Sequence, residues 1–133
     1  MQTKEYLQYI ATKIHSTVFA TVDGEGRPVT CAIDIMDYDA DGLYFLTAKG
    51  KNFYDRLKAN ENVAFTAMKG KDTLSCVAIS VQGKAKEIGP DRLPDLFRKN
   101  PYMEKIYPDV RSRSALTVFN IYEGTGEWFD LSK

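Results

Sequence analysis

The stretch GLYFLTAKGKNFYDRLKANENVAF, residues 42–65, decides the fold of this chain. Its first six residues follow the two-residue period of a β-strand, and a short polar turn with two lysines comes next. Phe53 and Leu57 then stand at the four-residue spacing of a helix face. Two asparagines end the helix before an apolar run begins again. The stretch therefore predicts a strand, a basic turn, a helix and a second strand in succession.

The turn between this strand and this helix has the features of an anion site. Lys49 and Lys51 lie in it, and Thr47 precedes it. The first backbone N–H groups of a helix have no partner within the helix, and they carry the positive end of its dipole. Together these groups can hold a phosphate. Lysines in such a turn are also ordinary solvated residues, so the pattern alone leaves both interpretations open.

The composition describes a small globular protein without a strong electric field. The 133 residues are 44% hydrophobic and 12% aromatic, which suits a single domain over residues 1–133. Eighteen basic residues balance 18 acidic ones, so nothing attracts nucleic acid or an anionic membrane. No segment reads as a signal peptide or as a membrane span. We expect a soluble, cytoplasmic protein that binds neither nucleic acid nor membrane.

The cysteines and the histidine argue against metal and hydrolase chemistry. His15 is the only histidine, and Cys31 and Cys76 are far apart with no CxxC spacing. A zinc site, a Ser-His-Asp triad and a Cys-His pair each need histidine geometry that this chain can barely supply. We therefore expect no metal, two buried free thiols, and a histidine at the end of the first helix, where positive charge is favoured.

The rest of the chain alternates strand patterns with tight-turn signals. The expected elements are a helix of about a dozen residues from Thr3, a hairpin of strands 17–22 and 28–36, an acidic turn at 37–41, a strand at 43–46, the helix after the basic turn, a strand at 63–68, an extended segment at 74–88 that bends at Gly83, two short helices within 91–107, a charged link at 109–114, and a final hairpin of strands 115–122 and 127–131. Such short connections favour a mainly β protein, an antiparallel sheet closed as a barrel with peripheral helices. The chain has neither a GxGxxG nor a Walker motif.

Several motifs follow one another along the chain: GRPVTCAIDI, YDADG, LYFLTAKGK, LKANENV and SVQGKAKEI. In this order and spacing they resemble the flavin-binding split barrel of the pyridoxamine 5′-phosphate oxidase-like family, and the chain is similar to its short bacterial members. The resemblance extends from residue 17 to about residue 131. It implies an antiparallel split β-barrel, and an FMN held at the interface of a homodimer.

The resemblance also implies which residues bind the FMN. In that family the strand that ends in threonine and the following basic turn bind the phosphate. The corresponding residues here are Thr47, Lys49, Lys51 and Asn52. The preceding strand offers backbone groups to the isoalloxazine ring. Its residues here are Val29, Thr30, Cys31, Ala32 and Ile33. Trp128 can stack on flavin or substrate across the dimer, or simply pack in the core or the dimer interface.

Two departures from the full-length oxidases bear on the substrate. Those enzymes carry a Ser-Arg-Lys run where this chain has Lys51-Asn52-Phe53, and an arginine after a C-terminal tryptophan, whereas none follows Trp128. We therefore do not expect oxidation of vitamin B6 vitamers. The resemblance implies an FMN-dependent reductase or oxidase of an unidentified small molecule, with hydride transfer at flavin N5. No catalytic side chain is assigned.

Other functions remain open on the sequence. One is a non-catalytic FMN-binding protein that carries electrons or stores flavin. Related split barrels also bind deazaflavin or heme. His15 lies outside the site expected for a heme ligand, which disfavours heme, but ligation by a tyrosine stays open. A dimerisation module without a cofactor would leave the lysines of the turn without a role.

Overall fold

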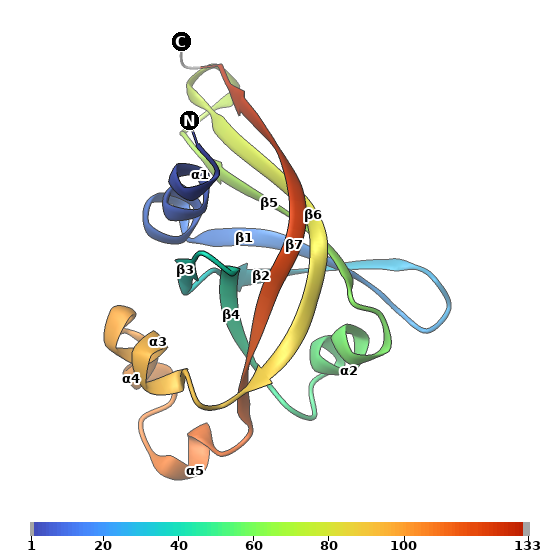
Figure 1. The fold of residues 1–133 in the computed structure, drawn as a ribbon, viewed down its shortest axis with the longest axis vertical. Helices are drawn as coiled ribbons and strands as arrows, with labels where there is room; N and C mark the ends of the chain where they lie inside the picture. Colours follow the sequence, from blue (N-terminus) through green and yellow to red (C-terminus); the bar gives the residue numbers. More distant parts are fainter. Residues whose placement is uncertain (1, 132–133) are drawn as a thin grey trace.

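A computed structural model of the chain describes residues 2–131, which form one coiled antiparallel sheet with short helices around it (Figure 1). The seven strands are ordered β2-β1-β5-β6-β7-β4-β3, and every pairing is antiparallel. The elements are α1 (Thr3–Tyr9), the π-helix η1 (Ile10–Ile14), β1 (Ser16–Val22), β2 (Pro28–Asp34), β3 (Asp37–Asp39), β4 (Gly42–Ala48), α2 (Asn52–Ala59), β5 (Asn62–Lys69), the 3₁₀ turn η2 (Thr73–Ser75), β6 (Val77–Gly89), α3 (Leu93–Lys99), α4 (Met103–Ile106), α5 (Val110–Arg113) and β7 (Leu116–Asp130).

The last strand corrects one prediction. Residues 115–131 were expected to form a hairpin, but β7 runs unbroken from Leu116 to Asp130. Gly124 lets β7 lie close to β6 instead of turning the chain: a Cβ added to it would lie 2.9 Å from the carbonyl oxygen of Gln82. A Cβ added to its register partner, Gly83 of β6, would lie 2.2 Å from the carbonyl oxygen of Glu123. The register of β6 also shifts between Lys84 and Ala85, so the bend expected at Gly83 lies one residue further along.

Two shorter segments also differ from expectation. The acidic turn predicted at residues 37–41 begins with the short strand β3, because Asp37, Tyr38 and Asp39 pair with the start of β4. The charged link predicted at residues 109–114 contains the helix α5. The Asp109 carboxylate caps it by accepting a 2.7 Å hydrogen bond from the Ser112 N–H.

Two apolar cores lie on opposite faces of β4, whose middle residues are all buried. Leu43 and Phe45 belong to the larger core inside the coiled sheet, and Tyr44 and Leu46 to the smaller core under α3 and α4. In the larger core the ring of Phe45 packs 4.9 Å from that of Phe19 and 5.6 Å from that of Phe119, centroid to centroid. Burial on both faces explains why β4 is an almost continuous apolar run.

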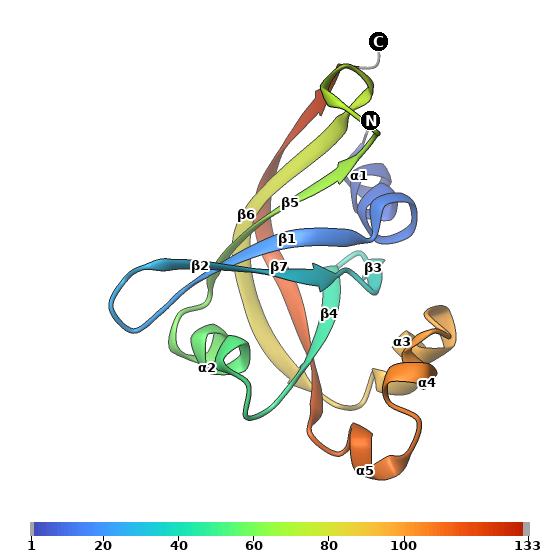
Figure 2. The ribbon, with the colours of Figure 1, turned by 180° about the vertical axis from the view of Figure 1, so that it is seen from behind.

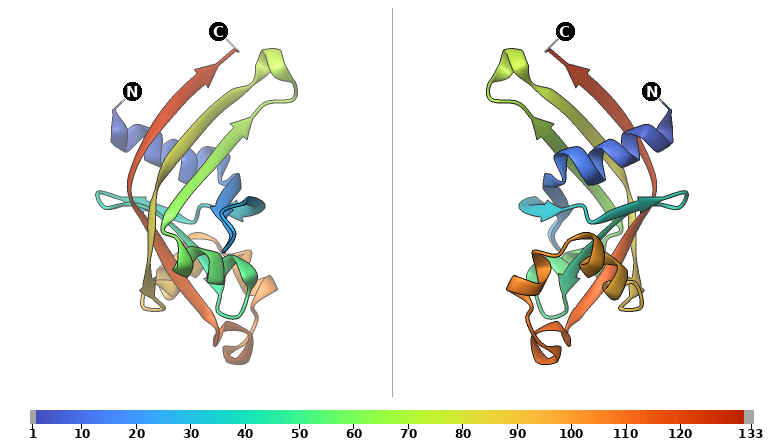
Figure 3. Two further views of the ribbon diagram at one scale, coloured as in Figure 1. Left: turned by 90° about the vertical axis from the view of Figure 1, so that its right-hand side faces the viewer. Right: turned by 90° about the vertical axis from the view of Figure 1, so that its left-hand side faces the viewer.

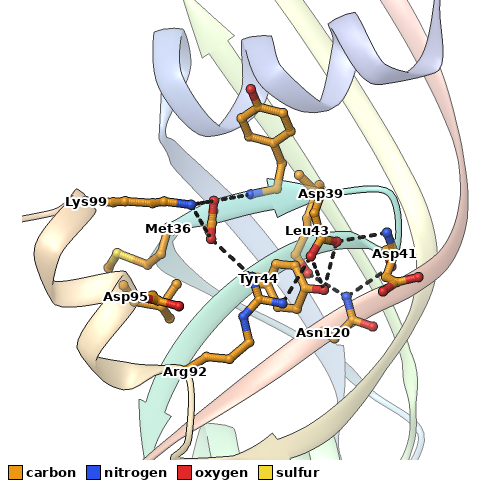
Figure 4. Close-up of polar contacts among 12 residues, drawn as sticks. Met36, Asp39, Asp41, Leu43, Tyr44, Arg92, Asp95, Lys99 and Asn120 are labelled. Carbon is orange, nitrogen blue, oxygen red and sulfur yellow. Dashed lines mark hydrogen bonds and ion pairs between the residues drawn. The ribbon is translucent and has the colours of Figure 1, made fainter.

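A polar network fixes α3 on β3 and β4 (Figure 4). Asp37, whose side chain is 4% exposed, accepts hydrogen bonds of 2.9 and 3.0 Å from the Lys99 ammonium. The Arg92 guanidinium bonds to Asp37 at 3.3 Å and Asp39 at 3.1 Å, and lies 3.9 Å from the centre of the Tyr44 ring. Burial, with the hydrogen bond from Tyr44 to Asp39, raises the pKa of Tyr44 to about 12. The network is fully paired, which indicates a structural role.

Among residues 2–131, none of the helices has the length and apolar character needed to cross a lipid bilayer.

Candidate functional site

The basic turn joins β4 to α2, and both of its lysines are exposed. Lys51 is the N-cap residue of α2, and its side chain makes no capping hydrogen bond. A lysine has no acceptor atom, so it leaves the first N–H groups of the helix open to an anion. The Lys49 N–H donates to the Ala115 carbonyl at 2.8 Å, which fixes the turn against the start of β7. Thr47 is buried in β4, and Asn52 begins α2 in an exposed position.

The five residues predicted to face the flavin ring form most of β2, at one edge of the sheet. Within residues 2–131 this strand pairs only with β1, so backbone N–H and C=O groups along its outer edge have no strand partner. The side chains alternate in exposure along the strand. Val29, Cys31 and Ile33 are half-buried, whereas Thr30 and Ala32 are exposed.

Helix α2 packs against β1, beside β2 (Figure 2). The Phe53 ring meets the Phe19 ring at 5.7 Å, and Phe19 is the register partner of Cys31. The Arg56 Nε donates a 2.7 Å hydrogen bond to the Thr21 hydroxyl. Burial raises the pKa of the Cys31 thiol, and the nearby Arg56 partly opposes that shift. The basic turn and β2 therefore lie on the same side of the fold.

Arg56 is a site residue that the sequence analysis missed. It is half-buried, and it places a positive charge between α2 and β2. The available signal was its spacing: Arg56 follows Phe53 by three positions and so lies on the flank of the helix face that packs on the sheet.

Trp128 lies away from these residues. It stands near the end of β7 as the register partner of Ile79 and packs beneath α1. Its ring is 5.4 Å from the Tyr6 ring and 5.2 Å from the Tyr9 ring. Any contact between Trp128 and the nine other predicted residues requires a second subunit, and this contact stays a prediction.

A second polar cluster lies between α2 and the sheet. The Glu87 carboxylate accepts hydrogen bonds from Thr117 at 2.7 Å, Tyr54 at 2.9 Å and Lys58 at 3.1 Å. Burial alone would raise the pKa of Glu87, but these three donors outweigh it and hold the pKa below its ordinary value. This cluster fixes α2 on the sheet through Tyr54 in its first turn and Lys58 in its last turn.

A third cluster borders the end of β2. His15 closes η1 as its C-cap, as the sequence predicted, in a left-handed conformation with φ of 69°. Its Nε2 lies 2.6 Å from the Tyr102 hydroxyl, which donates to Asp34 at 2.9 Å. Burial and this bond to Asp34 raise the pKa of Tyr102. Asp34 directly follows the five predicted flavin contacts, so the cluster adjoins the candidate site.

The cysteines and acids form no recognisable metal centre. Cys31 and Cys76 are free thiols, and both are half-buried where the sequence predicted buried ones. Within the described residues 2–131, no group of His, Cys, Asp and Glu side chains is arranged to hold a metal ion.

A family model for pyridoxamine 5′-phosphate oxidase matches residues 3–130 of this sequence. The chain belongs to the pyridoxamine 5′-phosphate oxidase family. This result confirms the resemblance drawn from the order of the motifs. A search of curated protein sequences found no match.

Solved structures with the same fold include other members and relatives of the pyridoxamine 5′-phosphate oxidase family. A NimC/NimA family protein from Clostridium acetobutylicum has a TM-score of 0.81 at 14% identity, over 98% of this chain and 86% of that one. A putative pyridoxamine 5′-phosphate oxidase from Listeria innocua has a TM-score of 0.72 at 15% identity, over 96% and 98%. HutZ, the heme-storage protein of Vibrio cholerae, has a TM-score of 0.66 at 14% identity, over 98% and 95%. These likenesses confirm the predicted antiparallel split barrel, and at such identities they support the fold alone.

Proposed function

We propose that this member of the pyridoxamine 5′-phosphate oxidase family binds FMN and acts as an oxidoreductase on a small molecule. The observation that carries the proposal is the position of the uncapped, lysine-flanked start of α2 on the same side of the fold as β2. One feature suits a phosphate and the other suits a planar heterocycle with hydrogen-bonding edges.

The phosphate end of FMN fits the first turn of α2. Lys49 and Lys51 supply positive charge, and the N–H groups that Lys51 leaves uncapped supply directed donors. Asn52 adds an exposed amide at the first helical position, and Thr47 is the last residue but one of the preceding strand. These are the four residues that the family resemblance assigns to the phosphate.

The ring end of FMN fits the edge of β2. Contacts from residues 29–33 would come from the backbone, so they depend little on side-chain identity. When bound, FMN supplies hydride transfer at N5. The chain supplies position, hydrogen bonds and the positive charge of Arg56 beside Cys31. No side chain is assigned as an acid or base.

We also propose a homodimer with the FMN at its interface. Val18 is 59% exposed on the outer face of β1, where its neighbours across the strands are Ala32 and Thr66. Met68, 64% exposed, and Phe129, 56% exposed, continue this apolar face on β5 and β7. Met68 and Phe129 are joined across Ala78 in one cross-strand row, and the row through Val18 continues into polar side chains. Exposed apolar side chains gathered on one face of a sheet favour an interface. A twofold dimer through this face would add groups from a second subunit to the cofactor site.

Heme binding, named for HutZ, is not proposed here. The only histidine, His15, has its Nε2 2.6 Å from the Tyr102 hydroxyl and 3.4 Å from Asp34 Oδ2. Axial ligation through Nε2 would break both of these contacts, and the chain has no second histidine. We place the protein in the cytoplasm, where its two free thiols stay reduced.

The test is an absorbance titration of the purified protein with FMN, followed by NADH or NADPH. Riboflavin, which has the ring without the phosphate, is the matched control ligand. We expect saturable binding of FMN at least about tenfold tighter than that of riboflavin, equivalent to about 1.4 kcal/mol. Prompt bleaching by a nicotinamide donor supports the oxidoreductase. Binding without bleaching by any donor favours the alternative, a non-catalytic carrier or flavin store, and absence of FMN binding overturns the proposal.

A further inference from the structure

A cavity of about 560 Å³ lies between α1 and the strands β6 and β7. Figure 3 shows α1 lying against one face of these strands, and Figure 1 shows α2 far from it. The apolar wall is formed by Leu7, Ile10, Leu43, Ile79, Val81 and Ile121. The volume lies in the range of small-molecule sites. None of the residues assigned above to the FMN phosphate or to the β2 edge lines this cavity.

The helix over this cavity is incompletely packed. Helix α1 contains no buried residue, although Tyr6 and Leu7 face the cavity, whereas Ile10, the next residue after the helix, is 1% exposed. The chain continues there as the π-helix η1. π-Helices are rare, and those that occur are often found at functional sites. Helix α1 is thus a cover anchored at one end. Segments with few buried apolar contacts open at low free-energy cost.

Aromatic rings stand at one side of the cavity. Trp128 lines it, and its ring meets those of Tyr6 and Tyr9 at 5.4 and 5.2 Å. Tyr6 and Trp128 are the two of these rings that line the cavity, and among residues 2–131 neither the Tyr6 phenol nor the Trp128 indole N–H is hydrogen-bonded to another group. A planar guest would therefore find an aromatic surface with donors that have no protein partner.

The charges at the cavity are all of one sign. Its charged lining residues are Asp41 and Glu123, both exposed, and no lysine or arginine lines it among the described residues. An anionic guest would be repelled, and a phosphate would have no partner. This is the opposite of the basic turn, so the two regions select different chemistry.

We propose that this cavity binds a small aromatic molecule that carries no negative charge, with α1 as its cover. The cavity shares no residue with the phosphate turn or the β2 edge, and within one subunit it does not depend on FMN being bound; Trp128, which lines it, is also the residue predicted to reach FMN across a dimer. An apolar wall, an aromatic side with free donors, and an acidic rim define the class of ligand.

The test uses N-phenyl-1-naphthylamine, a neutral fluorescent probe, titrated into the purified full-length protein with and without FMN. Trp128 is the only tryptophan, so energy transfer from it to the probe reports probe bound to the domain, and the variants on α1 described below locate it in the cavity. We expect saturable binding of one probe per chain, with quenching of Trp128 emission. The anionic 8-anilino-1-naphthalenesulfonate should bind at least about tenfold more weakly, because of the acidic rim. Equal affinity for both probes, or no saturable transfer from Trp128, overturns the proposal.

Variants on α1 locate the site further. Leu7→Glu places a charge in the cavity, and Leu7→Phe fills part of it without a charge; both should weaken probe binding at least about tenfold. Gln8→Glu adds the same charge on the exposed side of the same helix and should leave the affinity unchanged. Circular dichroism confirms that each variant is folded. If folded Leu7→Phe binds the probe like the original protein, the cavity is not the site.

Discussion

The side chain of Arg56 donates a 2.7 Å hydrogen bond to the hydroxyl of Thr21, and so ties α2 to β1. Thr21 is 1% exposed, so its hydroxyl has little access to water. The contact positions the helix whose first turn forms the proposed phosphate site next to the strand pair that carries the proposed ring site. Removal of the Thr21 hydroxyl therefore tests both the stability of the protein and the alignment of the proposed phosphate site with the proposed ring site.

Replacement of Thr21 by valine should lower the free energy of unfolding by about 1–2 kcal/mol, because the half-buried guanidinium loses its acceptor. The change keeps the shape of the side chain and its strand preference. Urea denaturation followed by fluorescence measures the effect. Thr73→Val in η2 is the control: Thr73 is exposed, and the expected change there is within about 0.5 kcal/mol. Equal losses in both variants would contradict a specific role for the Arg56–Thr21 bond.

Replacement of Lys51 by glutamate should weaken FMN binding by more than about tenfold, or about 1.4 kcal/mol. The change reverses the charge at the N-cap of α2, where the helix dipole and the phosphate would meet. Quenching of flavin fluorescence in a titration gives the affinity. Lys71→Glu, an exposed lysine in the turn between β5 and η2, is the matched control. Unchanged affinity in Lys51→Glu would remove the phosphate assignment.

The fold was predictable where one segment carries its own signal. The apolar run before the basic turn, the spacing of Phe53 and Leu57, and the turn between β1 and β2 each depend on a few adjacent residues. The alternation expected in that run is absent, because β4 is buried on both faces. The final hairpin was predicted wrongly because Gly124 and Gly126 resemble a turn. In the structure these glycines let β7 pair closely with the bent strand β6, where Gly83 is the register partner of Gly124. A local pattern cannot distinguish a glycine that turns a chain from one that lets two chains meet.

The residues of the candidate site likewise fall into those that a local pattern predicts and those that only the sheet topology brings together. Lys49 and Lys51 flank a helix start, so their chemistry is visible in the sequence. Arg56 meets Thr21 across 35 positions, and His15 meets Tyr102 across 87. Such pairs are determined by the sheet topology, and no spacing rule predicts them. The sequence predicts that Trp128 can stack on another ring, but its position beneath α1 depends on β7 being one unbroken strand.

Replacement of Val18 by aspartate should convert the proposed dimer to a monomer. The new charge would stand in the middle of the apolar outer face and would be buried without a partner in a symmetric interface. Size-exclusion chromatography with light scattering gives the mass. Val110→Asp is the control, since Val110 is 86% exposed on α5, outside this face. A dimer that persists in Val18→Asp, or a chain that is monomeric before any substitution, would contradict the proposed interface. FMN affinity should fall together with dimerisation if the site spans both subunits.

Replacement of Glu87 by glutamine should destabilise the protein at neutral pH and much less in acid. The Glu87 side chain is 15% exposed and accepts bonds from three donors, so loss of its charge should cost about 1–2 kcal/mol at pH 7. The pKa of Glu87 lies below the ordinary value of 4.5, so the folded state holds this carboxylate ionised more strongly than the unfolded state does. The resulting stability is complete above the unfolded pKa and disappears as the pH falls through the folded pKa.

The unfolding free energies of the original protein and of Glu87→Gln should therefore stay apart from pH 7 down to about 4.5, and converge only as the pH falls below 4.5 through the lowered pKa of the folded state. Urea denaturation across this range, in one buffer of constant ionic strength, gives both curves. Glu104→Gln, an exposed carboxylate on α4, supplies the control, and its curve should run within about 0.5 kcal/mol of the original at every pH. A constant gap between the Glu87→Gln curve and the original would mean that the carboxylate's charge contributes nothing. The loss at neutral pH would then come from packing around α2 and not from the three hydrogen bonds to an ionised group.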